Sequence, residues 1–189
     1  MINKVSRRPV FAAVTTLCMV VVGLFAGAAP AQAASTVPTW ISVLSGAAVG
    51  PKVIDIRARS TANTARAQLW DRIPGTAGDN QIWTIIPVPV SGSSYKAYNL
   101  RNKLSGKCLD KRSDVADVNG SQVQQYTCNS QPQQLWFFIG GFKSNAAWGE
   151  LWNSADGRCL DAVAPGDSNG TPLQVWDCSG ADNQRWNIS

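Results

Sequence analysis

Three aspartates recur along this chain, each followed at a matching distance by a glutamine and an aromatic residue. The glutamine stands 13 or 14 residues after the aspartate, and the aromatic residue stands two positions after the glutamine. Asp161, Gln174 and Trp176 are one such set. A carboxylate accepts hydrogen bonds from hydroxyl groups, an amide both donates and accepts them, and an aromatic ring offers an apolar face. Together these side chains suit the non-covalent binding of a ligand that has hydroxyl groups beside apolar patches.

The triplet Gln-x-Trp divides the chain into three copies of one unit. It stands at residues 81–83, 134–136 and 184–186, so the tryptophans are 53 and 50 residues apart. A period of this length is typical of a repeated supersecondary unit. We place the first, second and third repeats at about 41–90, 91–140 and 141–189, with joints at 89–94 and 140–147.

The elements that must position these side chains are predicted to be short strands. Apolar or β-branched segments with partial alternation are separated by Gly, Pro, Asn, Asp and Ser, which is typical of strands joined by turns. The segments are 52–57, 81–88, 122–127, 135–139 and 172–177. The two Asn-Gly pairs, at 119–120 and 169–170, indicate turns. The sequence therefore predicts an all-β fold.

Cysteines occupy matching positions in the second and third repeats. The pairs are Cys108 and Cys128, 20 residues apart, and Cys159 and Cys178, 19 residues apart. These four cysteines, without Cys18 in the N-terminal apolar run, allow three pairings. The corresponding positions of the first repeat are Val53 and Arg72, so both members of a pair are absent together. This favours the disulfides Cys108–Cys128 and Cys159–Cys178, each worth about 3 kcal/mol of stability, and leaves the first repeat to hold its loop by packing alone.

Residues 1–33 have the pattern of a secretory signal peptide. Basic residues at positions 4, 7 and 8 precede an apolar run over 10–29, and Ala31-Gln32-Ala33 supplies small residues for cleavage. The run is also long enough for a retained membrane anchor, and Arg7-Arg8 leaves twin-arginine export open. We expect cleavage, secretion, no membrane span in the mature chain, and a loose N-terminal arm at 34–40.

Removal of this leader changes the interpretation of the charge. The full chain has 17 basic and 12 acidic residues, and the leader holds three of the basic ones and none of the acidic ones. The remaining chain therefore has 14 basic residues against 12 acidic ones, a net charge of +2. So small a charge gives little support for a nucleic-acid partner, and we predict none.

The composition also excludes several kinds of catalytic and metal site. No histidine occurs, which excludes Ser-His-Asp and Cys-His catalysis and metal sites built on histidine. Glycoside cleavage needs two carboxylates about 5–10 Å apart across one bond, whereas the recurring aspartates fall one to a repeat. We predict no enzymatic activity, no cofactor and no metal site.

The Cys-Leu-Asp, Gln-x-(Trp/Tyr) and Gln-x-Trp motifs resemble the ricin B-chain-type lectin repeat, which also occurs in carbohydrate-binding modules of secreted bacterial glycoside hydrolases. The resemblance covers 41–189. It implies a β-trefoil, in which three four-stranded units surround a pseudo-threefold axis. It also implies sugar binding, because an aromatic ring can lie against the apolar face of a pyranose while a carboxylate binds adjacent hydroxyls.

The family's ligand residues, carried over position by position, give three candidate pockets. The third pocket consists of Asp161, Gln174, Trp176, Asn183 and Gln184. The first pocket consists of Asp55, Gln68, Trp70, Asn80 and Gln81. The second pocket consists of Asp110, Gln124, Tyr126, Gln133 and Gln134. The third matches the family pattern throughout. The first lacks the disulfide and has its Asn 10 rather than 7 positions after the aromatic residue, and the second has Gln133 in place of Asn.

Each of these residue types also has a purely structural interpretation. The triplet tryptophans Trp83, Trp136 and Trp186 are expected in the core, because a large apolar ring gains most from burial. The triplet glutamines can brace the fold instead of touching a ligand, and the aspartates can bond to local backbone in turns. The upstream aromatic residues can point inward from a strand, although we expect them to be exposed and to stack on sugar.

The sequence therefore favours a secreted, non-catalytic lectin or carbohydrate-binding module for galactose- or xylose-type glycans, with a monomer as the expected state. The alternative is an inert β-trefoil that serves as a scaffold or inhibitor and binds a protein partner. Saturable binding of sugars distinguishes the two.

Overall fold

The computed structural model describes residues 39–43, 50–90, 92, 96–114, 116, 118–140, 148–164 and 167–188. The predicted signal peptide, most of the N-terminal arm and most of the predicted joint at 140–147 lie outside these residues. None of the helices formed by the described residues is long and apolar enough to cross a membrane.

Each repeat contributes four short strands, which confirms the all-β prediction. The first repeat has β1 (Ile41–Val43), β2 (Val53–Ile56), β3 (Ala67–Trp70) and β4 (Trp83–Val88). The second has β5 (Ala97–Asn102), β6 (Cys108–Lys111), β7 (Ser121–Tyr126) and β8 (Trp136–Ile139). The third has β9 (Glu150–Asn153), β10 (Cys159–Ala162), β11 (Leu173–Trp176) and β12 (Trp186–Ile188). Short 3₁₀ helices are η2 (Arg57–Arg59), η3 (Gly75–Gln81), η4 (Pro132–Gln134) and η5 (Asp182–Gln184).

The first and last strands of each repeat form a closed ring. Antiparallel pairing joins β4 to β5, β5 to β8, β8 to β9 and β12 to β1. Two isolated bridges, Thr39 with Trp83 and Gly149 with Trp186, complete the ring. The ring closes without leaving an unpaired edge, which removes the template for aggregation that an open sheet presents.

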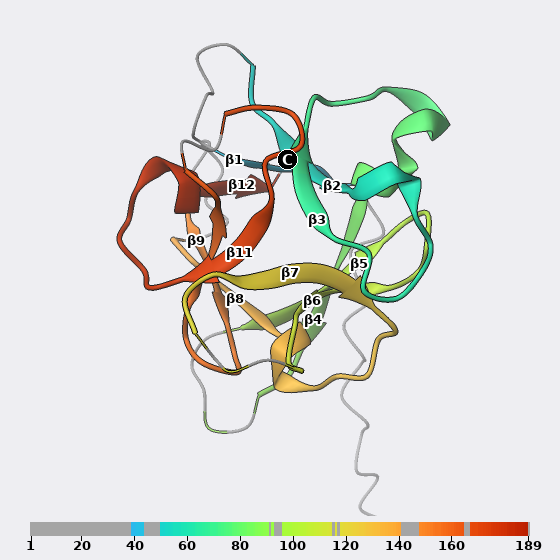
Figure 1. The fold of residues 1–189 in the computed structure, drawn as a ribbon. Helices are drawn as coiled ribbons and strands as arrows, with labels where there is room; N and C mark the ends of the chain where they lie inside the picture. Colours follow the sequence, from blue (N-terminus) through green and yellow to red (C-terminus); the bar gives the residue numbers. More distant parts are fainter. Residues whose placement is uncertain are drawn as a thin grey trace, which may run out of the picture. The chain divides into compact units, whose positions relative to one another are not determined.

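The middle strands of each repeat form a hairpin, and the three hairpins meet around one axis. They are β2–β3, β6–β7 and β10–β11. Strand β7 pairs with β11, and bridges from Arg66 to Gln124 and from Gln68 to Pro172 join β3 to both. Figure 1 looks onto these hairpins, with β3, β7 and β11 arranged around the centre of the view. Three four-stranded units around a pseudo-threefold axis are the β-trefoil that the resemblance implied.

The triplet tryptophans fill the core, as expected. Trp83, Trp136 and Trp186 are each fully buried. Each indole N–H donates to a backbone carbonyl of its own repeat's hairpin, at 3.2, 3.1 and 2.9 Å, respectively. The acceptor is always the residue immediately before the recurring aspartate: Ile54, Leu109 or Leu160. The triplet therefore fixes the position of the aspartate as well as filling the core.

Both predicted disulfides are present, and the first repeat replaces its missing one with polar contacts. Cys108 is bonded to Cys128 and Cys159 to Cys178. In the first repeat, Lys52 and Asp71 form an ion pair, and the Arg72 guanidinium lies 3.5 Å from the ring centre of Trp40. The prediction that packing alone holds this loop is therefore wrong.

The end of the predicted N-terminal arm belongs to the folded domain. The backbone N–H of Trp83 donates to the carbonyl of Thr39 at 2.9 Å, and Trp40 lies under Arg72. Residues 39 and 40 are therefore not a loose arm, because ring closure between β1 and β4 uses them.

One lysine is fully buried between the second and third repeats. Lys111 ends β6 and donates to the Asp156 carboxylate at 2.6 Å, and Arg158 binds the same oxygen at 3.0 Å. Burial raises the pKa of Asp156, but hydrogen bonds from Lys111 and Arg158 outweigh it and hold that pKa below its usual range. The matching positions of the other hairpins, Ile56 and Ala162, are apolar.

Candidate ligand pockets

In the third repeat, the aspartate is held by three side-chain amides. Asp161 on β10 lies directly opposite Gln174 on β11. The Gln174 amide donates to one carboxylate oxygen at 2.8 Å, and the amides of Asn183 and Gln184 donate to the other at 2.9 and 3.0 Å. The aspartate and the three amide residues predicted from the sequence therefore form one hydrogen-bonded cluster, carried by the β10–β11 hairpin and η5.

The first repeat builds the same cluster without a disulfide. Asp55 accepts from the amides of Gln68 at 3.0 Å, Asn80 at 2.6 Å and Gln81 at 3.1 Å. The three additional residues lengthen the 3₁₀ element, so η3 spans seven residues where η4 and η5 span three. The insertion is accommodated at the rim and leaves the aspartate geometry intact.

The second repeat lacks one of the three amides. Asp110 accepts from Gln124 at 2.9 Å and Gln134 at 3.0 Å. Among the described residues, Gln133 donates no hydrogen bond to Asp110, whereas Asn80 and Asn183 do so at the matching positions. The Gln133 side chain lines the pocket instead.

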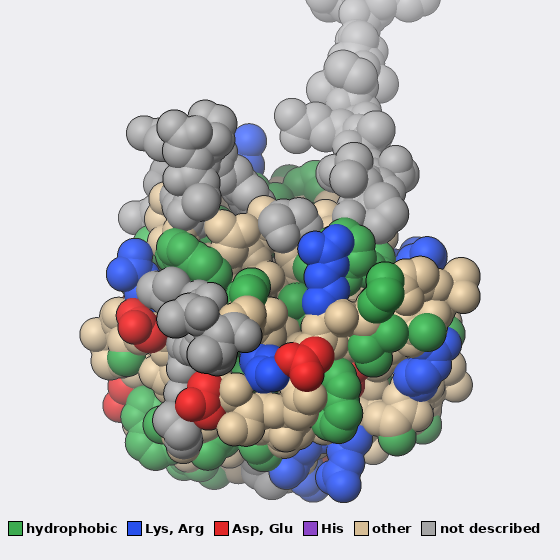
Figure 2. Space-filling model, turned by 90° about the horizontal axis from the view of Figure 1, so that it is seen from above, with side chains coloured by type: hydrophobic (Ala, Val, Ile, Leu, Met, Phe, Trp, Pro, Cys, Tyr) green, Lys and Arg blue, Asp and Glu red, His purple; other side chains and the backbone are tan. Residues whose placement is uncertain are grey.

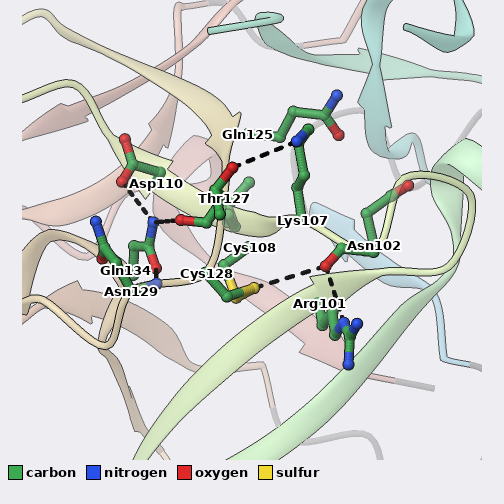
Figure 3. Close-up of a disulfide and its surroundings, with 12 residues drawn as sticks. Arg101, Asn102, Lys107, Cys108, Asp110, Gln125, Thr127, Cys128, Asn129 and Gln134 are labelled. Carbon is green, nitrogen blue, oxygen red and sulfur yellow. Dashed lines mark hydrogen bonds between the residues drawn. A yellow bond between two sulfur atoms is a disulfide. The ribbon is translucent and has the colours of Figure 1, made fainter. Parts of the chain in front are cut away.

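The side-chain amides of the triplet glutamines form hydrogen bonds within the protein. The Gln134 N–H₂ group donates to Asp110 and to the carbonyl of Thr127, and its oxygen accepts from the backbone N–H of Asn129 (Figure 3). Gln81 and Gln184 make the corresponding contacts, and all three are buried. Of the two interpretations open from the sequence, this geometry favours bracing of the aspartate over ligand contact.

Burial sets the electrostatics of the three aspartates. It raises the pKa of Asp55, Asp110 and Asp161 above the usual value of 3.8, and the amide hydrogen bonds oppose that rise without cancelling it. Each amide donates to the ionised form, so the carboxylate is held with a fixed orientation.

The upstream aromatic residues are exposed, in contrast to the triplet tryptophans. Trp70, Tyr126 and Trp176 end β3, β7 and β11 with 37%, 37% and 43% of their surface accessible. The glutamine two positions before each ring donates to the aspartate, so the ring and the carboxylate lie on one hairpin. A flat apolar face is thereby placed beside fixed polar groups in each repeat.

Each exposed aromatic residue is bordered by a turn from the preceding repeat. The side-chain oxygens of Asn63, Asn119 and Asn169 accept the backbone N–H of the residue after the aromatic at 3.0, 2.9 and 2.8 Å. These acceptors join the first repeat to the second, the second to the third and the third to the first. We call the three contacts the asparagine latches.

Backbone bonds reinforce the latches. The N–H groups of Thr64, Gly120 and Gly170, which directly follow the latch asparagines, donate to strand carbonyls of the next repeat at 2.9, 2.9 and 2.8 Å. These three residues have positive φ angles, which glycine adopts without strain. The Asn-Gly pairs did predict the turns, but nothing in one repeat's sequence shows that its turn borders another repeat's pocket.

Two of these sites line sizeable pockets that are open to solvent. The first pocket, of about 540 Å³, includes Asp55, Gln68, Trp70 and Asn80, with Gly170 from the third repeat. The second pocket, of about 380 Å³, includes Asp110, Gln124, Tyr126 and Gln133, with Thr64 from the first repeat. The sequence pattern did not predict the rim residues: Arg57, Arg59 and Ile73 at the first pocket, and Ser113, Asp114 and Asn129 at the second.

Surface charge is mixed on one face of the molecule. In Figure 2, acidic and basic side chains are interspersed on the face shown, among many uncharged polar groups.

Comparisons with known proteins agree with the geometry. The sequence model of the ricin-type beta-trefoil lectin domain matches residues 96–189. The solved structure of the designed threefold-symmetric protein ThreeFoil superposes with a TM-score of 0.64 at 25% identity, covering 79% of this chain and 96% of that one. The chain is a ricin B-type β-trefoil. Its first repeat, outside the matched residues, carries the same aspartate cluster.

Other proteins contain this β-trefoil as part of a longer chain. The structure of 1,3Gal43A, an exo-beta-1,3-galactanase from Clostridium thermocellum, has a TM-score of 0.66 at 24% identity, covering 82% of this chain and 30% of that one. The probable lipoprotein EnvE of Salmonella typhimurium is 32% identical over 81 residues, which are 43% of this chain and 39% of EnvE. This match spans well under half of that relative.

Proposed function

We propose that this ricin B-type β-trefoil is a secreted, non-catalytic carbohydrate-binding protein with one pocket in each repeat. The observation that carries the proposal is the exposed aromatic ring beside an amide-braced carboxylate, found in all three repeats. An apolar ring face suits the C–H surface of a pyranose, and a carboxylate accepts charge-strengthened hydrogen bonds from adjacent hydroxyls.

The ligands follow from this arrangement. Each site binds galactose- or xylose-type units of a glycan, and a single shallow site has an affinity of about 1 mM, or about −4 kcal/mol. Three sites distributed around the pseudo-threefold axis engage one polymer or cell surface together and gain avidity. The matched lectin-domain model, the name of the galactanase relative and the disulfides support this role.

The decisive experiment measures binding in each pocket separately. The indole N–H signals of Trp70 and Trp176 and the backbone N–H of Tyr126 report on the three pockets in NMR titrations with galactose and xylose oligosaccharides, and the backbone N–H of Asp177 reports on the third pocket in variants that lack the Trp176 indole. Trp176→Ala should weaken the third pocket about tenfold, equivalent to about 1.4 kcal/mol, and leave the other two unchanged. Trp176→Phe, which keeps an aromatic face, is the matched control and should retain most of the affinity.

Two results would count against the proposal. Absence of saturable binding to any saccharide, together with capture of a protein partner, would favour the scaffold interpretation. Release of reducing sugar from a bound polysaccharide would show that the protein is an enzyme.

A further inference from the structure

The first pocket differs from the other two in carrying two arginine side chains at its rim. Arg57 and Arg59 line the same cavity as Asp55 and Trp70. We propose that this pocket selects saccharides with an anionic substituent, foremost a uronic-acid carboxylate, whose charge pairs with these two guanidinium groups. The inference rests on the proposed function and names the class of sugar that one of its sites prefers.

The position of the arginines follows from the hairpin. Strand β2 carries Asp55 and ends at Ile56, and η2 (Arg57–Arg59) begins at the next residue. Ala58 and Arg59 have φ angles of 57° and 52°, a left-handed conformation that costs about 1–2 kcal/mol for a residue other than glycine. Strained backbone of this kind persists where surrounding structure holds it and is found at ligand-binding sites.

The insertion of the first repeat supports this turn from across the pocket. The Arg59 guanidinium donates to the backbone carbonyl of Thr76 in η3 at 3.3 Å. That contact ties one arginine to the element that only the first repeat has lengthened. It therefore positions the Arg59 guanidinium at the rim of the enlarged cavity.

The guanidinium groups retain donors for a ligand. Arg57 and Arg59 are exposed, and among the described residues the Arg57 guanidinium makes no hydrogen bond or ion pair. A guanidinium has five N–H donors in a planar fork that fits a carboxylate bidentately. Arg59 uses one donor on Thr76, so both groups can bind an anion.

The Asp55 carboxylate does not neutralise this rim. Its oxygens already accept three side-chain amides, and it is buried. Burial raises its pKa, and the nearby Arg59 charge is among the effects that oppose the rise. Counted over the lining residues, one carboxylate faces two guanidinium groups, which leaves the first pocket with net positive charge.

The other two pockets lack this charge. Asp114 lines the second pocket together with Asp110, and the neighbouring Arg112 is already ion-paired to Asp114. In the third repeat, Asp161 is followed by Ala162, Val163 and Ala164, which carry no charge. Among the described residues, the first pocket is thus the one whose lining combines two guanidinium groups with a single carboxylate.

A paired-ligand titration tests the proposal. Galactose and galacturonate differ at C6, where galacturonate has a carboxylate, and galactose 6-sulfate provides an alternative anion. At low ionic strength, the Trp70 indole N–H should report about three- to tenfold tighter binding of galacturonate than of galactose, consistent with two partly exposed charge contacts. The Tyr126 and Trp176 signals should show no such preference, and 0.5 M salt should reduce it at Trp70.

The variant Arg57→Gln/Arg59→Gln should abolish the preference at Trp70 while galactose still binds. The control Lys96→Gln/Arg101→Gln removes the same charge from exposed residues that do not line the cavity, and it should preserve the preference. Tighter binding of the sulfate than of the carboxylate would support the pocket but overturn the order of anions.

The outcomes separate the two proposals. Equal affinity of the first pocket for galactose and galacturonate, or a preference that survives the double arginine variant, overturns the inference and leaves sugar binding in place. Failure of every saccharide to shift any of the three signals overturns both.

Discussion

The recurring aspartates combine two properties that usually oppose each other. They are buried, which disfavours the ionised form, yet each accepts two or three amide hydrogen bonds that favour it. Because burial dominates, the pKa of Asp161 lies above the usual 3.8. The carboxylate thus takes up a proton at a higher pH than an ordinary aspartate.

This shift predicts acid-sensitive binding. As the pH falls through the raised pKa values, Asp55, Asp110 and Asp161 lose an acceptor oxygen, so saccharide affinity should fall before an ordinary aspartate titrates. The sign for stability is opposite: a raised folded-state pKa means that the folded protein binds the proton more tightly, so protonation of these groups adds stability. Titration of saccharide binding and near-ultraviolet circular dichroism over the same pH series should show loss of affinity while the fold remains.

Acid unfolding should begin later and come from other groups. Hydrogen bonds from Lys111 and Arg158 hold the pKa of Asp156 below its usual value despite burial, so its stabilisation is present above the unfolded pKa and is lost as the pH falls through the folded one. Affinity and fold that disappear at the same pH would contradict this separation.

At the scale of elements, the asparagine latches make every pocket the product of two repeats. Asn169 belongs to the third repeat but binds the backbone N–H and carboxylate of Asp71, next to Trp70 of the first. A Cβ atom added at Gly170, in the same turn, would lie 3.9 Å from the Trp70 ring. Ring position in one repeat therefore depends on a side chain about 100 residues away.

Removal of one latch should weaken a neighbouring pocket. Asn169→Ala deletes two hydrogen bonds, so we expect a loss of about 1–2 kcal/mol in stability and a few-fold loss of affinity at Trp70. The third pocket, in the same repeat as the substitution, should keep its affinity at Trp176. Asn63→Ala, the equivalent substitution in the first repeat, is the control and should lower affinity at Tyr126 instead. An effect confined to each variant's own repeat would disprove the latch assignment.

These contacts also show which parts of the sites could be predicted from the sequence and which could not. The spacing of Asp161, Gln174 and Trp176 predicts a hairpin cluster because all three lie within one repeat and strand alternation fixes their faces. The latch of Asn169 on Asp71 depends on how repeats pack together, and no local periodicity encodes that. The same holds for Arg59, whose position follows from a left-handed turn and an insertion peculiar to the first repeat.

For the molecule as a whole, the repeats share one arrangement of strands but differ in their contacts with one another. Lys111 and Asp156 form a buried ion pair between the second and third repeats, where the other hairpins carry Ile56 and Ala162. Ion pairs of this kind lose much of their Coulomb attraction to desolvation. Their larger effect is that neither charge can be removed alone.

Substitution of the pair should therefore be strongly non-additive. Lys111→Met leaves the Asp156 carboxylate buried with Arg158 alone, and we expect about 3 kcal/mol loss in the free energy of unfolding. The double variant Lys111→Met/Asp156→Asn removes both charges and should recover most of that loss in urea denaturation. A double variant that is no more stable than Lys111→Met would contradict this explanation.

The pairing of β1 with β12 sets Ile41 opposite Ile188, so both ends of the domain lie in the same ring. Ring closure and the cyclic order of the latches do not depend on which repeat comes first in the polypeptide. A circular permutant that links β12 to β1 and opens between β8 and β9 would preserve every strand pair, because β8 and β9 would then pair at the ends of the chain as β1 and β12 do here. The order of the repeats along the chain therefore does not determine how they pack together. A single repeat made as a free chain would hold the aspartate cluster of one pocket and the asparagine latch of another.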